Sequence, residues 1–235
     1  MKIALLGYGK MGKAIEKMAQ ERGHSIVAKL ETDITDDFNF GQADIAIDFS
    51  IPLAAFKNIT TAFKKGIPVV SGTTGWLDKY DEVVEVCKKY DEAFIYASNF
   101  SLGVNLFFDL NKKLAQLMQK FDAYQVSIEE THHTQKKDAP SGTAISLAEQ
   151  VIDNSSKEEW SLENTSDTKN INIKANRLPE VPGTHWVNYT SKVDQISLKH
   201  EAFSRQGFAL GAVIAAEWLV GKKGVFTMND VLNIG

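Results

Sequence analysis

The sequence predicts an α/β protein: a parallel sheet flanked by helices, and a second α+β domain whose open sheet is largely antiparallel. Three observations support this fold class. Over residues 1–100, short apolar runs alternate with amphipathic segments, as in strand–helix–strand units. The first strand ends in a glycine-rich turn, which is typical of a Rossmann-type domain. After residue 120, apolar and polar residues alternate, which indicates strands with one solvated face.

The composition excludes several classes of function. A net charge of −4 gives no broad basic surface for nucleic acid, so an acidic substrate would need a local cationic pocket. Cys87 is the only cysteine, which excludes an intrachain disulfide and a cysteine-based metal site, and we predict no metal site. The N-terminal apolar run before Gly7 has only four residues, too few for a signal-peptide core, and no apolar run has the length of a membrane span, so we expect a cytoplasmic protein.

The first strand–helix–strand unit has the pattern of a dinucleotide-binding motif. A strand over residues 2–6 enters the turn Gly7-Tyr8-Gly9-Lys10-Met11-Gly12, and an amphipathic helix follows until Gly23. Glycines let the backbone approach a pyrophosphate, whose charge the helix N-terminus favours. The next strand, residues 25–30, ends at Glu31, which is placed to accept hydrogen bonds from the adenine ribose hydroxyls.

Three further strands are expected in the first domain, at residues 45–49, 67–70 and 93–97, with helices from Pro52 to Lys65, capped by Ser50, and from 78 to 90. Residues 32–43 are too short and polar for a full helix. Ligands of open α/β sheets lie beyond the carboxyl ends of the strands. There we expect the nicotinamide half of a cofactor, next to Phe49, Ser50, Gly72, Thr73, Thr74, Ala97, Ser98, Asn99 and Phe100. By themselves these segments would be ordinary strand-to-helix loops.

The second half of the chain has a different pattern of secondary structure. A long helix over residues 101–119 precedes a strand at 124–130, and a helix at 141–152 is followed by a long polar loop at 154–170. Alternating strands are expected at 171–177, 185–190 and 194–202. The apolar segment 208–220 predicts a buried helix, and residues 227–230 cap a terminal helix.

The stretch from His132 to Thr143 contains the clearest candidates for chemistry. It has two adjacent imidazoles, His132 and His133, and Lys136 four residues after the first. Histidine can donate a proton near neutral pH, and lysine provides a cation and a second acid. Ser141-Gly142-Thr143 precedes an apolar run, so it should open a helix whose free N–H groups bind a carboxylate or phosphate. Alone, either feature would more often be a solvated loop.

The segment Glu130-Thr131-His132-His133-x-x-Lys136-x-Asp138-Ala139-Pro140-Ser141-Gly142-Thr143-Ala144 resembles the signature of the 4-hydroxy-tetrahydrodipicolinate (dihydrodipicolinate) reductase family of bacterial lysine and diaminopimelate biosynthesis. Matching segments extend over nearly the whole chain. They include the family's Asp-Phe-Ser/Thr, Gly-Thr-Thr-Gly and Asn-Phe-Ser loops, which here are the strand ends expected near the nicotinamide. The family usually shows Gly-x-x-Gly-x-Met-Gly in the first turn, so the interval between the first two glycines is one residue shorter in this chain.

The resemblance implies a reductase that takes NADH or NADPH and reduces the ring formed from 4-hydroxy-tetrahydrodipicolinate. It implies His132 as proton donor or acceptor and Lys136 as an assisting acid. The groups expected to hold the two substrate carboxylates are His133, Lys136, Ser141, Gly142 and Thr143. Asp138 would fix the loop, while His24, His185 and His200 lie outside the motif and would be solvent-facing or satisfied in the core.

The resemblance also implies how the chain is divided and assembled. A cofactor domain would comprise residues 1–100 and 206–235, and a substrate-binding and oligomerisation domain residues 101–205, with a homotetramer as the assembly. Arg205 would lie near the cofactor. Many family members place an arginine for the NADPH phosphate where this chain has Thr32, but Lys10 is a basic residue that could reach the same phosphate.

Two other functions stay open from the residues. Another small Rossmann-type amino-acid dehydrogenase would explain Gly7 to Glu31, but not His132 to Thr143. A non-catalytic dinucleotide-sensing protein would have no need of a proton donor.

Overall fold

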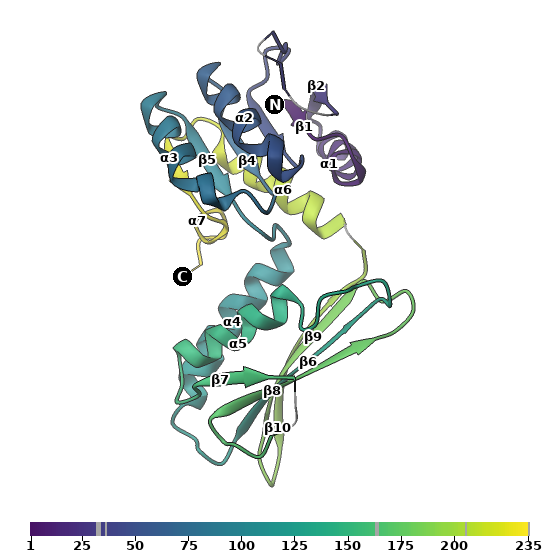
Figure 1. Cartoon of the computed structure of the whole chain (residues 1–235), viewed down its shortest axis with the longest axis vertical. Coiled ribbons are helices and arrows are strands. Elements are labelled where there is room, and N and C mark those ends of the chain that lie inside the picture. The colour runs from purple at the N-terminus through teal and green to yellow at the C-terminus, as the bar shows by residue number, and fades with distance from the viewer. Residues whose placement is uncertain (32–33, 36, 163–164, 205, 235) are drawn as a thin grey trace. The chain divides into compact units, whose positions relative to one another are not determined.

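The computed structural model describes residues 1–235 apart from 32–33, 36, 163–164, 205 and 235 (Figure 1). The chain divides into two compact units. Unit 1 comprises Met1–Leu102 and Gln206–Gly235, and unit 2 comprises Gly103–Arg205. The fold class predicted from the sequence is confirmed, with one parallel sheet in unit 1 and a second sheet in unit 2.

Unit 1 is built on a six-stranded parallel sheet of order β11-β5-β4-β3-β1-β2. The strands are β1 (Lys2–Leu6), β2 (Ser25–Leu30), β3 (Ile45–Asp48), β4 (Val69–Ser71), β5 (Ala93–Tyr96) and β11 (Gly224–Phe226). The strand order reverses at β1, between β2 and β3, and a crevice for ligands forms beyond the carboxyl ends at such a point. The sequence analysis missed β11, whose three residues are too few to show a period.

Helices cover both faces of this sheet. They are α1 (Lys10–Glu21), α2 (Pro52–Lys64), α3 (Tyr80–Lys89), preceded by the 3-10 turn η1 (Leu77–Lys79), α6 (Gln206–Leu219) and α7 (Met228–Leu232). Ile3 and Leu5 of β1 pack in the core that contains α1 and α6, whereas Ala4 and Leu6 pack in the core that contains α2 and α3. Because both faces are covered, the inner strands are largely apolar, whereas the edge strand β2 contains the exposed Lys29.

Unit 2 contains a five-stranded mixed sheet of order β10-β9-β6-β8-β7. Its strands are β6 (Gln125–His132), β7 (Glu159–Ser161), β8 (Asn170–Arg177), β9 (Gly183–Thr190) and β10 (Gln195–Ala202). The β10–β9 and β9–β6 pairs are antiparallel, as expected, but β6–β8 and β7–β8 are parallel. After β6 the chain crosses back through helix α5 (Gly142–Asp153), and such a crossover returns the chain in the same direction. Helix α4 (Leu102–Met118) packs with α5 in the core under the sheet.

Several local expectations are settled by the structure. The capping box of Thr227 and Asp230 at α7 is confirmed. Strand β7 lies inside the segment expected to be a polar loop, because it finds an edge to pair with on β8. Ile51, not Ser50, is the N-cap of α2, with Pro52 in its first turn, because the Ser50 hydroxyl is bonded to Asp48 instead. Among the described residues, no helix combines the length and apolar character needed to cross a membrane.

Candidate active site

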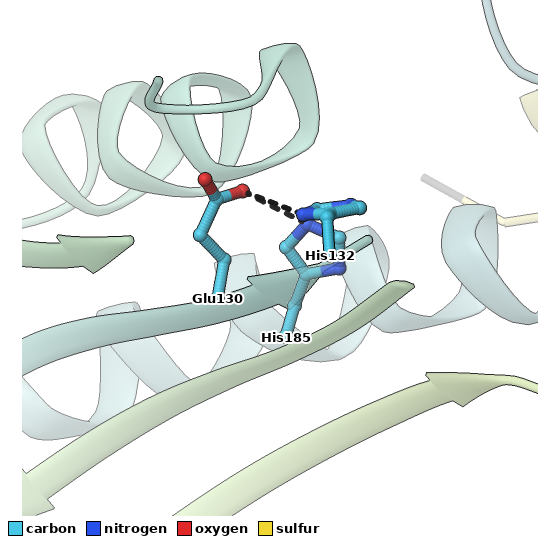
Figure 2. Close-up of side chains that lie close together, drawn as sticks. All are labelled: Glu130, His132 and His185. Carbon is cyan, nitrogen blue, oxygen red and sulfur yellow. Dashed lines mark ion pairs between the residues drawn. The ribbon is translucent and has the colours of Figure 1, made fainter. Parts of the chain in front are cut away.

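The end of β6 and the start of β9 bring a carboxylate and two imidazoles together in unit 2 (Figure 2). Glu130 and His132 lie two residues apart on β6, so their side chains share one face of the sheet. Glu130 is the register partner of His185 on β9, which places the His185 side chain on the same face. All three side chains are buried, with exposed fractions of 0%, 8% and 5% respectively.

Glu130 is the centre of this cluster. Its Oε2 atom lies 3.3 Å from Nδ1 of His132 and 3.6 Å from Nε2 of His185. The backbone N–H of Ser141 donates to both carboxylate oxygens, at 3.1 and 3.2 Å, and Nη2 of Arg177 donates to Oε1 at 3.1 Å. Burial raises the pKa of the Glu130 carboxyl, but the two imidazoles and the Ser141 donor outweigh it and hold that pKa well below its usual range. Glu130 is therefore ionised at neutral pH.

His185 is tied to the start of α5. Its Nε2 atom lies 3.1 Å from the hydroxyl of Ser141, and that hydroxyl also accepts from the N–H of Ala144 as the N-cap of α5. Burial lowers the pKa of the His185 imidazole, and the nearby His132 and Lys136 lower it further against the opposing effect of Glu130. A lowered pKa makes His185 a neutral imidazole at neutral pH.

The same three side chains offer donor atoms within 4.8 Å of one another, a set that also occurs in metal sites. Here the carboxylate already has a cation, because the Arg177 guanidinium contacts Glu130. The cluster thus has its negative charge neutralised by protein groups.

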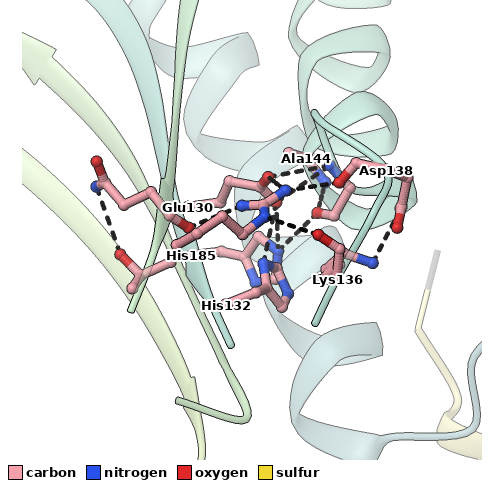
Figure 3. A network of polar contacts seen from close by, with 10 residues as sticks. Glu130, His132, Lys136, Asp138, Ala144 and His185 are labelled. Carbon is pink, nitrogen blue, oxygen red and sulfur yellow. Dashed lines mark hydrogen bonds and ion pairs between the residues drawn. The ribbon is translucent and has the colours of Figure 1, made fainter. Parts of the chain in front are cut away.

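The signature loop, residues 133–140, follows β6, and Figure 3 shows its Lys136 next to Asp138. Nζ of Lys136 lies 2.9 Å from Oδ2 of Asp138, and this ammonium lowers the pKa of the Asp138 carboxyl. Asp138 therefore accepts from the loop's own lysine, as expected for a loop-fixing residue. Within the described part of the chain, Nδ1 of the partly buried His133 has no hydrogen-bond partner. Gly142 and Thr143 form the first turn of α5, where backbone N–H groups have no helical acceptor.

Sequence reasoning missed two members of the cluster. His185 was expected to stand apart from the motif, but strand pairing brings it next to Glu130. Arg177 was not singled out at all. It ends β8, where it is the register partner of His132, 45 positions earlier in the chain. No spacing rule in the sequence reports such a neighbour, because the strand order decides it.

In unit 1 the glycine turn takes the tight conformation that its residues allow. Gly7 has φ +96°, and a Cβ there would lie 2.2 Å from the carbonyl oxygen of Phe49, so only glycine fits. A Cβ on Gly12 would lie 2.3 Å from the Gly7 oxygen, which lets α1 pack closely against the turn. Gly9, the N-cap of α1, gives the helix no side-chain cap, and no atom lies within 4 Å of a Cβ placed there. The N–H groups of the first turn of α1, which begins at Lys10, thus have no side-chain acceptor from the N-cap.

A cavity of about 210 Å³ lies next to this turn. It brings together three of the segments predicted to surround the cofactor, and it is lined by Met11, Phe49, Ser50, Pro52, Gly72, Thr73 and Thr74. Glycine is needed at position 72, because a Cβ there would lie 2.3 Å from the Phe49 ring.

The loops around this cavity are fixed by a buried acid that the sequence analysis did not identify. Asp48 accepts from the hydroxyls of Ser50 and Thr73, both at 2.7 Å. It also accepts from the Ser71 hydroxyl at 2.8 Å and from the Asn58 amide at 3.4 Å. Four donors from three segments therefore meet on one carboxylate with no exposed surface.

The other predicted cofactor residues lie at the same edge of the sheet or outside the described residues. Ala97, Ser98, Asn99 and Phe100 follow β5, and the Phe100 ring lies 5.8 Å from that of Phe49. Glu31 is exposed directly after β2. The Tyr8 side chain is held by two neighbours. Its hydroxyl donates to Glu16, and the Lys29 ammonium lies 4.4 Å from its ring centroid. Arg205 and Thr32 lie outside the described residues.

Comparison with known proteins assigns the family. The family model described as "Dihydrodipicolinate reductase, N-terminus" matches residues 1–100, and the one described as "Dihydrodipicolinate reductase, C-terminus" matches residues 103–232. A Christiangramia forsetii protein named 4-hydroxy-tetrahydrodipicolinate reductase is 60% identical over 235 residues, which cover 99% of this chain and 98% of that protein. A protein of the same name from Archaeoglobus fulgidus is 36% identical over 263 residues, covering 99% and 100%.

A solved structure supports the fold independently. The dipicolinate-bound dihydrodipicolinate reductase from Paenisporosarcina sp. TG-14 has a TM-score of 0.77 at 22% identity, and the match covers 97% of each chain. Together with the two family models, which leave few residues unmatched, these relatives show that the chain belongs to the dihydrodipicolinate reductase family of pyridine-nucleotide-dependent oxidoreductases.

Proposed function

We propose that the chain reduces 4-hydroxy-tetrahydrodipicolinate to tetrahydrodipicolinate with NADH or NADPH, a step of lysine and diaminopimelate biosynthesis. One observation carries the proposal: Glu130, His132 and His185 gather at the start of α5, next to the loop that bears Lys136. The cytoplasm would be the compartment of this biosynthetic step.

The substrate groups follow from its two carboxylates. A dicarboxylate needs cations and oriented N–H donors on a chain of net charge −4. Lys136 supplies a cation, and the first turn of α5 supplies N–H groups at Gly142 and Thr143, while the N–H of the N-cap Ser141 is held by Glu130. The unpartnered Nδ1 atom of His133 is a further group that could contact a carboxylate.

His132 is the proposed proton donor. The reaction loses the ring hydroxyl as water and adds a hydride and a proton to the resulting conjugated imine. Nδ1 of His132 lies 3.3 Å from the Glu130 carboxylate, so Nε2 is the ring nitrogen left for proton transfer. Lys136 is the second acid, which assists protonation or the loss of the hydroxyl.

The cofactor would bind to unit 1. The open space at Gly9, the uncapped start of α1 and the cavity beside Phe49 fit a pyrophosphate and the group that follows it. When bound, the reduced nicotinamide supplies the hydride. Met11 and the loops from Phe49, Gly72 and Ala97 would orient it. Glu31 would accept from the ribose hydroxyls of NADH, and Lys10 would contact the 2′-phosphate of NADPH.

Unit 2 would also form the assembly interface of a homotetramer. On the sheet, hydrophilic side chains border a cavity of about 610 Å³, which is lined in part by Ser127, Glu129, Asn172, Lys174 and Asn188. A second copy could pair with such an uncovered face. Light scattering should give the mass of four 26.0 kDa chains, and a stable monomer at micromolar concentration would contradict this assembly.

The decisive experiment is oxidation of NADH or NADPH with the synthase product supplied as substrate. Turnover would separate this function from an amino-acid dehydrogenase and from a non-catalytic sensor. His132→Gln should lower kcat by ~10²–10⁴-fold and leave cofactor affinity near wild type. Lys136→Ala should be comparably damaging and should also raise KM. Near-normal turnover of His132→Gln would remove His132 from the mechanism.

A further inference from the structure

Arg177 lies where the signature loop meets the buried cluster. It is the last residue of β8 and the register partner of His132, and its side chain is 20% exposed. The signature loop, residues 133–140, contains turns and bends but no strand or helix. A loop without regular hydrogen bonding needs side-chain contacts to hold one conformation.

The Arg177 guanidinium supplies such contacts. Nη2 donates to the carbonyl oxygen of Asp138 at 2.6 Å and to Oε1 of Glu130 at 3.1 Å. Nε donates to the carbonyl oxygen of Lys136 at 3.4 Å, and Nη1 donates to that of Asn176 at 2.7 Å. One planar group thus joins the buried carboxylate next to His132 to the backbone at both ends of the Lys136–Asp138 segment.

We infer that Arg177 is a positioning residue, which holds the Lys136–Asp138 segment in register with Glu130 and His132. The inference rests on the proposed function, in which Lys136 and His132 act on the same ring. Four of the five guanidinium N–H groups are directed at protein acceptors, so the side chain is committed to the loop and not to a substrate carboxylate.

The geometry requires arginine and not simply a positive charge. The acceptors lie around the edge of the guanidinium plane, which a planar fork reaches simultaneously. The ammonium of lysine is a single point at the end of a flexible stem, so Arg177→Lys would keep the charge beside Glu130 but lose most of the bonds to the loop. Arg177→Lys therefore distinguishes a role in positioning the loop from a role in neutralising the charge of Glu130.

The test compares Arg177→Lys and Arg177→Ala with Lys113→Ala. Lys113 lies in the same unit, on α4, but its side chain is 58% exposed and its ammonium pairs with Asp109 at 2.7 Å. Steady-state kinetics, NADH binding and amide hydrogen exchange of residues 134–140 are measured for each protein. Both Arg177 variants should lose about 10²-fold in kcat, because small displacements of a catalytic group have effects of that size. NADH affinity should stay within about twofold, since unit 1 is untouched.

The loop readout is independent of activity. Residues 134–140 should exchange faster in both Arg177 variants and at the wild-type rate in Lys113→Ala. Millimolar guanidinium ion should partly restore kcat in Arg177→Ala. A raised KM with unchanged kcat would make Arg177 a substrate contact and overturn the inference, as would unchanged exchange. If Arg177→Ala does not fold, Arg177→Lys gives the same comparisons. A wild-type protein without turnover would refute the proposed function, while the exchange rates would still decide the role of Arg177.

Discussion

Replacing Asp48 by asparagine should destabilise unit 1 and loosen the loops around the proposed cofactor cavity. The Asp48 carboxylate has no exposed surface and accepts four hydrogen bonds, two on each oxygen. Asparagine keeps one carbonyl oxygen and puts an NH₂ donor in place of the other, so about two of these bonds are lost. A hydrogen bond contributes ~1 kcal/mol, or ~1.5–3 kcal/mol when one partner is charged, so the loss of two should cost unit 1 roughly 2–6 kcal/mol.

The size of this loss should depend on pH in a definite direction. Burial raises the pKa of the Asp48 carboxyl above its ordinary 3.8, and the four hydrogen bonds offset only part of that rise. A raised pKa in the folded state means that the folded chain prefers the protonated acid. The advantage of wild type over Asp48→Asn is therefore complete below pH 3.8 and declines as the pH rises through the raised pKa.

Urea unfolding monitored by tryptophan fluorescence can isolate unit 1. Two of the four tryptophans, Trp160 and Trp186, lie in unit 2 and can be replaced by phenylalanine. Of the two that remain, Trp76 is buried and donates its indole N–H to the carbonyl oxygen of Thr73 at 2.6 Å, directly on the loop that Asp48 holds. The control is Asp78→Asn, which removes the charge of an exposed acid in the same unit.

Two results would contradict these roles of Asp48. If Asp48→Asn unfolds at the same urea concentration as wild type, the four hydrogen bonds contribute nothing. If the difference between the two proteins grows as the pH rises above 3.8, Asp48 prefers its charged form in the fold, and burial does not dominate.

Three further results are expected. Lys10→Ala should weaken NADPH use more than NADH use, by about fivefold at physiological salt, and the wild-type NADPH reaction should be the more sensitive to added salt; an NADPH preference that survives the change would place the phosphate elsewhere. Gly183→Ala should lower kcat by up to about 10²-fold, because the new Cβ would lie 3.0 Å from Nε2 of His132, and normal kcat would show that the ring can move aside. Glu130→Gln should destabilise unit 2 near neutral pH, because the pKa of the Glu130 carboxyl is lowered in the fold. The difference in unfolding free energy from wild type should shrink as the pH falls below 4.5, and a difference that persists in acid would contradict that charge state.

Features that depend on residues within a few positions could be read from the sequence. A tight glycine turn was expected after the first strand, and in that turn Gly7 and Gly12 lie against backbone atoms that exclude a Cβ. Ser141 was expected to open a helix, and it is the N-cap of α5. Such features are predictable because the conformation of a turn or cap is set by the local chain itself.

Other features depend on strand pairing and register, which only the tertiary structure determines. Strand β11 exists because β5 offers an edge, and the parallel part of the second sheet follows from the crossover through α5. Glu130 and His185, and His132 and Arg177, meet because of strand register across 55 and 45 positions. Asp48 reads as one more residue at the end of a strand until three segments direct their donors at it. The sequence by itself determined which residues could do the chemistry, and tertiary packing determined which buried charges hold them, since a buried charge is stable only where the fold supplies its partners.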